Sequence, residues 1–389
     1  MDTRTDKNTG DTISLLGFGC MRLPVIDGKS QCIDKSAAQQ MVDYALAHGV
    51  NYFDTAYPYH MGASESFVGE AMSRYPRGSY HLASKMPLFS LKTRKDVERI
   101  FQEQLGKCRT DYFDFYLMHS VNETLMGVME KFDVYRTLKK EQKRGRIRRL
   151  GFSFHGTLDV LERLVEQYEF DFAQIQLNYL DWELQNARRQ YEILTERGIP
   201  VIVMEPVRGG ALASLNEAAR GVFQAAGINN GKNGPSGQDA PASLASWALR
   251  FCASLPNVLC ILSGMTTMEQ LQDNLATLSG FQPLSKEEYA VIEQALTAYK
   301  AAGAVPCTGC GYCMECPSGV DIPRVFGLYN EWQVSHQAMG YWIGLELIGE
   351  GKWAQNCTDC GHCLELCPQQ IAIPERMKEI TEGMKELRL

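Results

Sequence analysis

Short apolar segments alternate with amphipathic helix patterns along the part of the chain before Cys307, and this alternation leaves few folds open. The segments are rich in β-branched and aromatic residues, as buried parallel strands are. Eight such segments, each followed by a helix or loop, is the count of a (β/α)8 TIM barrel. A doubly wound sheet would alternate in the same way, but no GxGxxG motif follows the first segment. The sequence therefore predicts an α/β fold with a barrel in residues 13–303, whose strands are Ser14–Cys20, Val50–Thr55, Tyr80–Lys85, Tyr112–His119, Ile147–Ser153, Asp171–Gln176, Pro200–Glu205 and Val258–Ser263.

The charge and the first residues of the chain argue against several classes of protein. A net charge of −7 argues against a nucleic-acid partner and against a membrane-surface partner. Residues 1–12 are polar and contain no apolar run of signal-peptide length, so we expect a loose N-terminal tail there. No segment approaches the roughly 18 apolar residues of a membrane-spanning helix. We therefore expect a cytoplasmic protein with no membrane partner.

Eight of the thirteen cysteines fall in two short runs near the C-terminus. The first run spans Cys307–Pro323 and the second spans Cys357–Pro374. Their first three cysteines repeat at an offset of 50 residues, and each run closes with Cys-Pro and then Ile-Pro, so the segment is internally duplicated. In a reducing compartment, clustered cysteines indicate a metal site.

The second run has the cysteine spacing of bacterial ferredoxins, CxxCxxCxxxCP, and the last gap of the first run is one residue shorter. Two-residue gaps let three thiolates converge on one cubane from a tight loop. In two-cluster ferredoxins the fourth cysteine of each run binds the other cluster. We therefore predict a small α-rich, two-cluster ferredoxin-like domain in residues 304–389. Its [4Fe–4S] ligands would be Cys307, Cys310, Cys313 and Cys367 for cluster 1, and Cys357, Cys360, Cys363 and Cys316 for cluster 2.

Structural zinc and disulfides are the alternatives for these cysteines. Zinc commonly takes two CxxC pairs that are far apart in the chain, and two four-cysteine runs ending in Cys-Pro fit that pattern poorly. His362 lies inside the second run, but the cysteines suffice as ligands, so we expect it to be an exposed loop residue.

Four polar residues stand at or near the ends of predicted barrel strands, where barrel enzymes carry their chemistry. Asp54, Lys85 and His119 end the second, third and fourth strands, and Tyr59 follows Asp54 by five residues. A lone lysine at a strand end is usually a paired or solvated charge, and a lone tyrosine usually packs. All four at matched strand ends instead indicate a catalytic site.

The segments DTAYPYHMGASE, LASKMP, FDFYLMHS and SGMTTMEQLQDN resemble the aldo/keto reductase family. The segments MEPVRGG and CTGCGYCMECP are similar to the members that carry a ferredoxin extension. The resemblance implies an NAD(P)H-dependent oxidoreductase that reduces a small-molecule carbonyl or oxidises an alcohol. Tyr59 would be its general acid or base, Lys85 would lower the pKa of that phenol, and Asp54 would pair with Lys85. His119 would donate to the carbonyl oxygen and orient the substrate.

The same resemblance implies a nucleotide site along the strand ends. Ser153 and Gln174 would bond the nicotinamide carboxamide, and Met204 would lie against the ring. Arg208, Gly209 and Gly210 would approach the pyrophosphate. The full set of implied nucleotide contacts is Met21, Asp54, Ser153, Gln174, Met204, Pro206, Arg208, Gly209, Gly210, Gly264, Thr266, Gln270, Asp273 and Asn274. The adenosine loop lacks the Lys and Arg that many members place on the 2′-phosphate, so both NADP(H) and NAD(H) remain candidates.

A nicotinamide gives two electrons as hydride, whereas a cubane passes one electron at a time, and a flavin normally mediates between them. The sequence contains no clear flavin motif, so a flavin and an external electron carrier are both open. The basic segment Lys139–Arg149 is either a helix C-terminus favoured by the helix dipole or a docking site for an acidic carrier. The Gly- and Asn-rich segment Asn229–Pro241 is either a surface insertion or a lid.

The alternative function is a redox or nicotinamide sensor, or an electron-transfer subunit, with little carbonyl turnover. The G-x-T-x3-Q-x2-D-N spacing from Gly264 to Asn274 is similar to that of potassium-channel β subunits, which bind NADPH. The intact set of four polar residues favours the enzyme.

Overall fold

A computed structural model of the protein describes residues 1–226, 243–300, 305–335 and 338–386. The segment Asn229–Pro241 lies outside the described residues. By their contacts the residues form two compact units. The barrel unit comprises Met1–Val207 and Asn229–Ser285, and the C-terminal unit comprises Arg208–Ile228 and Lys286–Leu389. None of the helices in the described ranges is long and apolar enough to cross a membrane.

The barrel unit contains a closed barrel of eight parallel strands in the order β10-β3-β4-β5-β6-β7-β8-β9. The prediction of a (β/α)8 TIM barrel is therefore confirmed. Each observed strand overlaps one expected strand; they are β3 (Leu16–Gly19), β4 (Tyr52–Asp54), β5 (His81–Met86), β6 (Phe113–Val121), β7 (Ile147–Phe154), β8 (Phe172–Gln176), β9 (Val201–Met204) and β10 (Val258–Gly264).

Amphipathic helices follow the strands, and each buries its apolar stripe against the sheet. Helix α3 begins with a capping box in which the Thr93 side chain and the Asp96 side chain satisfy each other's backbone N–H groups. The helices of this unit are α1 (Lys35–Ala47), α2 (Ala63–Met72), α3 (Arg94–Lys107), α4 (Glu123–Lys131), α5 (Val134–Lys143), α6 (Leu158–Gln167), α7 (Asp181–Leu184), α8 (Ala187–Glu196), α10 (Leu244–Ala253) and α11 (Met268–Leu278).

Large apolar side chains fill the interior of the barrel. Phe115 packs edge-on against Tyr52 and Phe172, with 4.9 Å between ring centroids in each pair. The barrel is thus a packed core, and its chemistry is confined to the rim where the strands end.

The N-terminal residues form a hairpin rather than the loose tail that we expected. Strand β1 (Thr3–Thr5) pairs antiparallel with β2 (Thr12–Ser14). Between them Asp6 is buried and accepts a hydrogen bond from Arg149 Nε at 3.2 Å. Polarity alone suggested disorder, but the polar groups of this segment find partners elsewhere in the barrel unit. Arg149, the last residue of the basic segment Lys139–Arg149, is therefore buried and hydrogen-bonded within the barrel unit.

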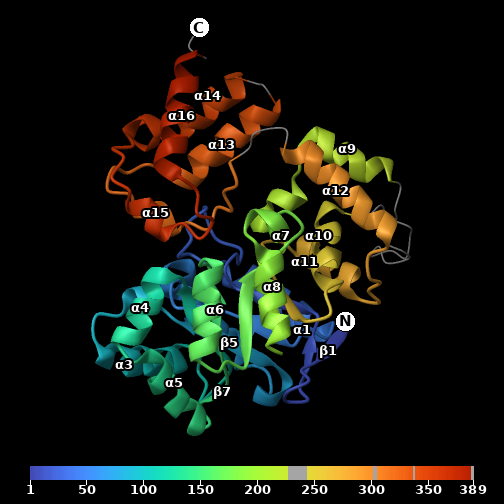
Figure 1. The fold of residues 1–389 in the computed structure, drawn as a ribbon, viewed down its shortest axis with the longest axis vertical. Helices are drawn as coiled ribbons and strands as arrows, with labels where there is room; N and C mark the ends of the chain where they lie inside the picture. The colour runs from blue at the N-terminus through green and yellow to red at the C-terminus, as the bar shows by residue number, and fades with distance from the viewer. Residues whose placement is uncertain (227–242, 301–304, 336–337, 387–389) are drawn as a thin grey trace. The chain divides into compact units, whose positions relative to one another are not determined.

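The C-terminal unit is built from helices, as expected for an α-rich domain. Helices α9 and α12 lie side by side (Figure 1), although both fall inside the residue range predicted for the barrel. The predicted domain boundary at residues 303/304 therefore differs from the division by contacts. The helices are α9 (Glu217–Ala225), α12 (Lys286–Lys300), α13 (Ile322–Ser335), α14 (Ala338–Ile348), α15 (His362–Leu366) and α16 (Ile373–Glu386).

The apolar core of this unit includes cysteines of both runs. Val325, Phe326 and Leu345 are buried together with Cys313 and Cys363. The cysteine loops are therefore anchored on the same core that holds the helices together.

Candidate active site and cluster-binding loops

Neighbouring barrel strands bring the four predicted catalytic residues together at one rim. Strand β4 pairs with β5 so that Asp54 faces Ala83, and β5 pairs with β6 so that Lys85 faces Leu117. Lys85 Nζ donates to Asp54 Oδ1 at 2.5 Å and to Tyr59 Oη at 3.3 Å.

His119 completes the group from β6. Its ring lies edge-on to Tyr59, with 6.1 Å between centroids. Tyr59 itself begins the 3-10 turn η1 (Tyr59–Gly62) that follows β4. A phenol, an ammonium, a carboxylate and an imidazole therefore share one small region.

The buried charges of Lys85 and Asp54 are paired, which offsets part of the cost of removing each from water. Lys85 and Asp54 are both almost fully buried. Burial lowers the pKa of Lys85 and raises the pKa of Asp54, and the hydrogen-bonded contact between them acts in the opposite direction on each. The Thr55 carbonyl accepts a further hydrogen bond from Lys85 at 2.9 Å, so the ammonium has three protein partners.

Tyr59 and His119 are both neutral in this environment. Burial raises the pKa of Tyr59 well above 10, Asp54 and Glu205 add to the rise, and Arg22 opposes it. Burial therefore dominates the pKa of Tyr59 in the protein alone, and the lowering of that pKa by Lys85 stays a prediction. Burial, with a further contribution from Lys85, holds the pKa of His119 well below 6.5. Both groups can thus act as hydrogen-bond donors at neutral pH.

Residues predicted to hold the nicotinamide lie on β7, β8 and β9. Ser153 is buried, and its Oγ accepts a hydrogen bond from the Ser120 N–H at 2.8 Å. Gln174 Nε2 contacts Met204 Sδ at 3.6 Å. Gln174 Oε1 is buried and has no hydrogen-bond partner within the described residues. A buried acceptor of this kind fits the N–H of a carboxamide.

The predicted adenosine loop connects β10 to α11. Thr267 caps α11 in a capping box with Gln270, whose Oε1 also accepts from the Thr266 N–H at 2.7 Å. Asp273 accepts from the Ser243 hydroxyl at 2.7 Å, and Asn274 Nδ2 donates to Ser263 Oγ at 2.9 Å. Protein contacts thus hold these residues in place before any nucleotide binds.

The remaining predicted nucleotide residues are divided between the two units. Met21 follows β3 and is partly exposed, and Pro206 follows β9 and is buried. Arg208, Gly209 and Gly210 belong to the C-terminal unit. Arg208 is buried there, and its Nη2 donates to Gln369 Oε1 at 3.3 Å. Its guanidinium therefore already has a protein partner, and a pyrophosphate role for it stays a prediction.

Each of two cavities in the C-terminal unit is lined by one predicted set of four cysteines. Site 1 and site 2 each combine three cysteines of one run with the fourth of the other run. Site 1 is lined by Cys307, Cys310, Cys313 and Cys367, and site 2 by Cys316, Cys357, Cys360 and Cys363.

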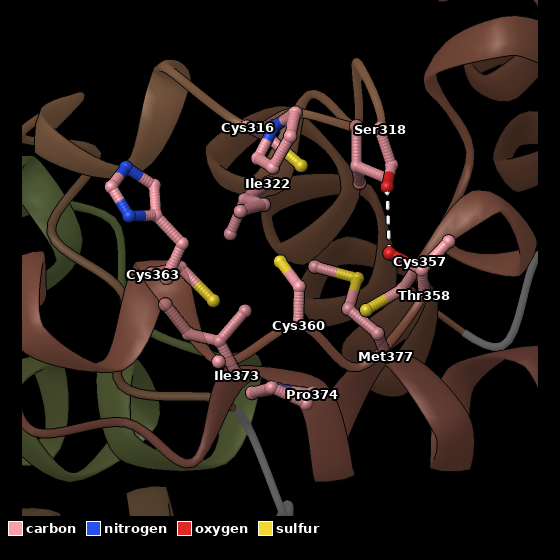
Figure 2. Close-up of a pocket in the computed structure, with 14 residues that line it drawn as sticks. Cys316, Ser318, Ile322, Cys357, Thr358, Cys360, Cys363, Ile373, Pro374 and Met377 are labelled. Carbon is pink, nitrogen blue, oxygen red and sulfur yellow. Dashed lines mark hydrogen bonds between the residues drawn. The ribbon is translucent and has the colours of Figure 1, made fainter.

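The loops around site 2 are tied to each other. Figure 2 shows the sulfur atoms of Cys316, Cys360 and Cys363 turned toward a shared space. The hydroxyls of Ser318 and Thr358, from different runs, are hydrogen-bonded at 2.9 Å. The hydrogen bond therefore joins the first cysteine run to the second, the two runs that together supply the cysteines of site 2.

A glycine stands between the second and third cysteine of each run. Gly311 and Gly361 have φ of 82° and 72°, a left-handed conformation that suits glycine. The chain can therefore turn tightly enough for three cysteines of one loop to face one cavity.

The electrostatics of the sulfur groups suit a cationic occupant. Burial, together with the neighbouring Cys357, Cys316 and Cys360, raises the pKa of Cys363 to about 11. A buried thiol of this kind resists deprotonation unless a metal supplies positive charge. In the described part of the chain, no three His, Cys, Asp or Glu side chains lie close enough to share a single metal ion. A cubane spreads its four ligands over four iron atoms, so its ligands stand farther apart.

Two family models match the chain. Residues 15–297 match the aldo/keto reductase family, and residues 306–372 match a 4Fe-4S dicluster domain. The chain belongs to the aldo/keto reductase family. The resemblance inferred from sequence is confirmed for the barrel and for the ferredoxin-type extension. This aldo/keto reductase is thus an oxidoreductase with an appended 4Fe-4S domain.

Known proteins resemble this aldo/keto reductase over its barrel. An uncharacterized oxidoreductase of Bacillus subtilis is 24% identical over 72% of this chain and 92% of its own length. The NADH-specific methylglyoxal reductase of Escherichia coli is 23% identical over 70% of this chain and 91% of its own length. An aldo/keto reductase from Klebsiella pneumoniae, crystallised with NADP and acetate, has a TM-score of 0.58 at 20% identity, covering 76% of this chain and 95% of that one.

Sequence reasoning missed three charged or titratable residues near the four catalytic candidates of this reductase. Arg22 and Glu205 both act on the pKa of Tyr59, and His155 acts on that of His119. Each lies within three residues of the end of a barrel strand. That position is the signal that could have found them, since residues just past the strand ends surround the rim.

Arg22 also contacts the adenosine loop. The Thr266 hydroxyl donates to the Arg22 carbonyl at 2.9 Å, and a β-carbon on Gly264 would meet Arg22 Cγ at 3.2 Å. Arg22 therefore links the catalytic rim to the loop at the start of α11.

Proposed function

We propose that this aldo/keto reductase reduces a small-molecule carbonyl with NADH or NADPH, and oxidises the alcohol in reverse, with Tyr59 as general acid and base. The observation that carries the proposal is the contact of Lys85 with both Tyr59 and Asp54 at the barrel rim, beside His119. A positioned proton donor next to a buried cation is what carbonyl reduction requires.

The proton transfer follows from these contacts. A bound nicotinamide would supply the hydride to the carbonyl carbon. His119 would donate a hydrogen bond to the carbonyl oxygen and hold it in place. Tyr59 would then give its phenolic proton to the alkoxide. The phenolate that remains would lie 3.3 Å from the Lys85 ammonium, which favours the charged form.

The nucleotide would be held by residues of the barrel unit. Gln174 Oε1, a buried acceptor, would take the carboxamide N–H, and Ser153 and Met204 would complete the nicotinamide pocket. We further propose that Arg22, between Tyr59 and the adenosine loop, supplies the cation for the nucleotide phosphates. Named relatives include an enzyme specific for NADH and one crystallised with NADP, so the choice of nucleotide is left to binding measurements.

We infer that site 1 and site 2 each hold a [4Fe–4S] cluster for one-electron transfer. The support is the match to a 4Fe-4S dicluster domain and the cavity that each set of four cysteines lines. A flavin or an external electron carrier would connect these one-electron centres to the two-electron chemistry of the barrel. We also infer a cytoplasmic location, because cysteines clustered as metal ligands are typical of a reducing compartment.

The test is anaerobic purification followed by iron, sulfide, flavin and nucleotide analysis, and then turnover of NADH or NADPH with a panel of aldehydes and ketones. We expect about eight irons and eight sulfides per chain, from two four-iron clusters. Stoichiometric zinc without sulfide would contradict the cluster assignment. Tight nucleotide binding with no turnover on any carbonyl would contradict the reductase and leave the sensor.

A further inference from the structure

The turn at Arg208 and Gly209 is built against site 1. Arg208 follows the end of β9 by four residues, yet it groups with the C-terminal unit. Both residues have a left-handed backbone, with φ of 51° and 64°. Arg208 is only 1% exposed, and its Nη2 donates to Gln369 Oε1 at 3.3 Å.

The partners of this turn line site 1. Gln369 stands two residues after Cys367, and Thr308 follows Cys307; both line the cavity. A β-carbon on Gly209 would overlap the Thr308 carbonyl oxygen, so the backbone approaches the loop as closely as a glycine permits. A buried guanidinium is thereby held one side chain away from the ligands of site 1.

Site 2 lacks this arrangement at the corresponding place of the duplication. The residue two positions after its fourth cysteine, Cys316, is Ser318, which hydrogen-bonds the Thr358 hydroxyl. Among the described residues, no Lys or Arg lines either site; at site 1 the charge lies one side chain farther out, on Arg208, which donates to the site-lining Gln369. The two sites thus share a ligand pattern and differ in the charge next to the fourth cysteine.

We propose that Arg208 is a positioning residue that raises the reduction potential of the cluster in site 1 relative to the same ligands without the charge. The proposal rests on the proposed [4Fe–4S] occupancy of site 1. Reduction adds one electron to the cluster, and a nearby fixed positive charge favours that state. Burial of the guanidinium limits the screening of its charge by solvent and salt. The charge therefore biases the electron toward site 1.

The experiment is an anaerobic redox titration of the full chain, followed by EPR. The signals of the two sites are assigned with Cys310→Ser and Cys360→Ser. In Arg208→Gln we expect the oxidised-to-reduced ratio of site 1, at a fixed potential, to rise about tenfold, which is about 59 mV for a one-electron couple. Site 2 should keep its potential. Arg208→Lys retains the positive charge, so site 1 should keep most of its wild-type potential in that variant. Arg324→Gln, an exposed arginine of the same unit, is the matched control and should move neither site.

A second variant covers the case in which Arg208→Gln loses its iron. Gln369→Glu places a carboxylate where Arg208 can pair with it, so the positive charge is neutralised while the arginine stays. The site 1 potential should fall in this variant too. The proposal is overturned if variants with full iron content leave site 1 unmoved, if both sites shift equally, or if the control Arg324→Gln shifts site 1 by the same amount. Wild-type protein without iron and sulfide would instead overturn the cluster assignment itself.

Discussion

Lys85 connects the acid, the carboxylate and the backbone of the barrel rim. A fully buried ammonium is costly unless it is paired and hydrogen-bonded. Its contacts with Asp54, Tyr59 and the Thr55 carbonyl meet that requirement. The same contacts place the positive charge where a phenolate would form, so the arrangement that makes burial tolerable also serves proton transfer.

Replacing Tyr59 by Phe should lower kcat for carbonyl reduction by roughly 100-fold to 10,000-fold, the usual contribution of a general acid. The nucleotide Kd should change little, because the hydroxyl is needed only when the alkoxide forms. Steady-state kinetics and nucleotide titration measure the two effects. Tyr57→Phe is the control, since the Tyr57 hydroxyl bonds Glu103 instead. Equal kcat in the Tyr59 variant would remove the acid role.

The pH profile should follow the raised pKa of Tyr59. An acid must be protonated to act, and burial raises this pKa well above 10, so reduction should show no loss from phenol ionisation up to pH 10. Alcohol oxidation needs the phenolate, so its rate should rise with pH over the same range. His119, with a pKa well below 6.5, stays neutral and should add no break near that value. A fall in the reduction rate with a midpoint below pH 9 would contradict this.

Strand β8 offers a matched test of the nucleotide site, because it carries two glutamines whose side chains differ in their hydrogen-bond partners. Gln174 Oε1 has no partner within the described residues, whereas Gln176 Nε2 donates to Asp181 at 2.7 Å. Gln174→Met should weaken nucleotide binding about tenfold, the worth of one hydrogen bond, with little loss of stability. Gln176→Met should cost stability and leave the affinity nearly unchanged. Calorimetry and thermal unfolding separate the two outcomes.

Each cavity is lined by three cysteines of one run and the fourth cysteine of the other, and substitution can test whether the cluster ligands are exchanged in this way. Cys367→Ser should remove the same cluster as Cys310→Ser, although Cys367 belongs to the other run. Each change should lower the iron content by about four atoms and alter one EPR signal. If Cys367→Ser instead reproduces Cys360→Ser, each run binds its own cluster and the exchange is wrong.

For the whole molecule, the central question is whether the barrel and the clusters exchange electrons. We expect NADH or NADPH, added anaerobically with FMN or a candidate substrate, to bleach the clusters and produce an EPR signal. The reason is that a cubane accepts electrons singly once a mediator splits the hydride pair. Protein without nucleotide, and Gln174→Met protein at low nucleotide, are the controls. Clusters that stay oxidised under every combination would have a structural role instead.

Part of this molecule could be predicted because its signals are local. Eight strands, the order of Asp54, Tyr59, Lys85 and His119 along them, and the spacing of the cysteines are all patterns within a few residues. The N-terminal hairpin could not be predicted in this way. Asp6, between its strands, is hydrogen-bonded to Arg149, which is 143 residues away in the chain and is brought close only by the fold.

By itself the sequence determined the barrel, the family and which cysteines could share a cavity, because repeat period and ligand spacing are properties of short segments. Only the tertiary structure decided the state of Tyr59, whose pKa depends on burial and on Glu205 and Arg22 from distant strand ends. It also decided that Arg208 donates to Gln369, a residue that lines one of the two cysteine-lined cavities. The physical reason is the same in both cases. Burial and charge act through space, and the residues that supply them are brought together by folding.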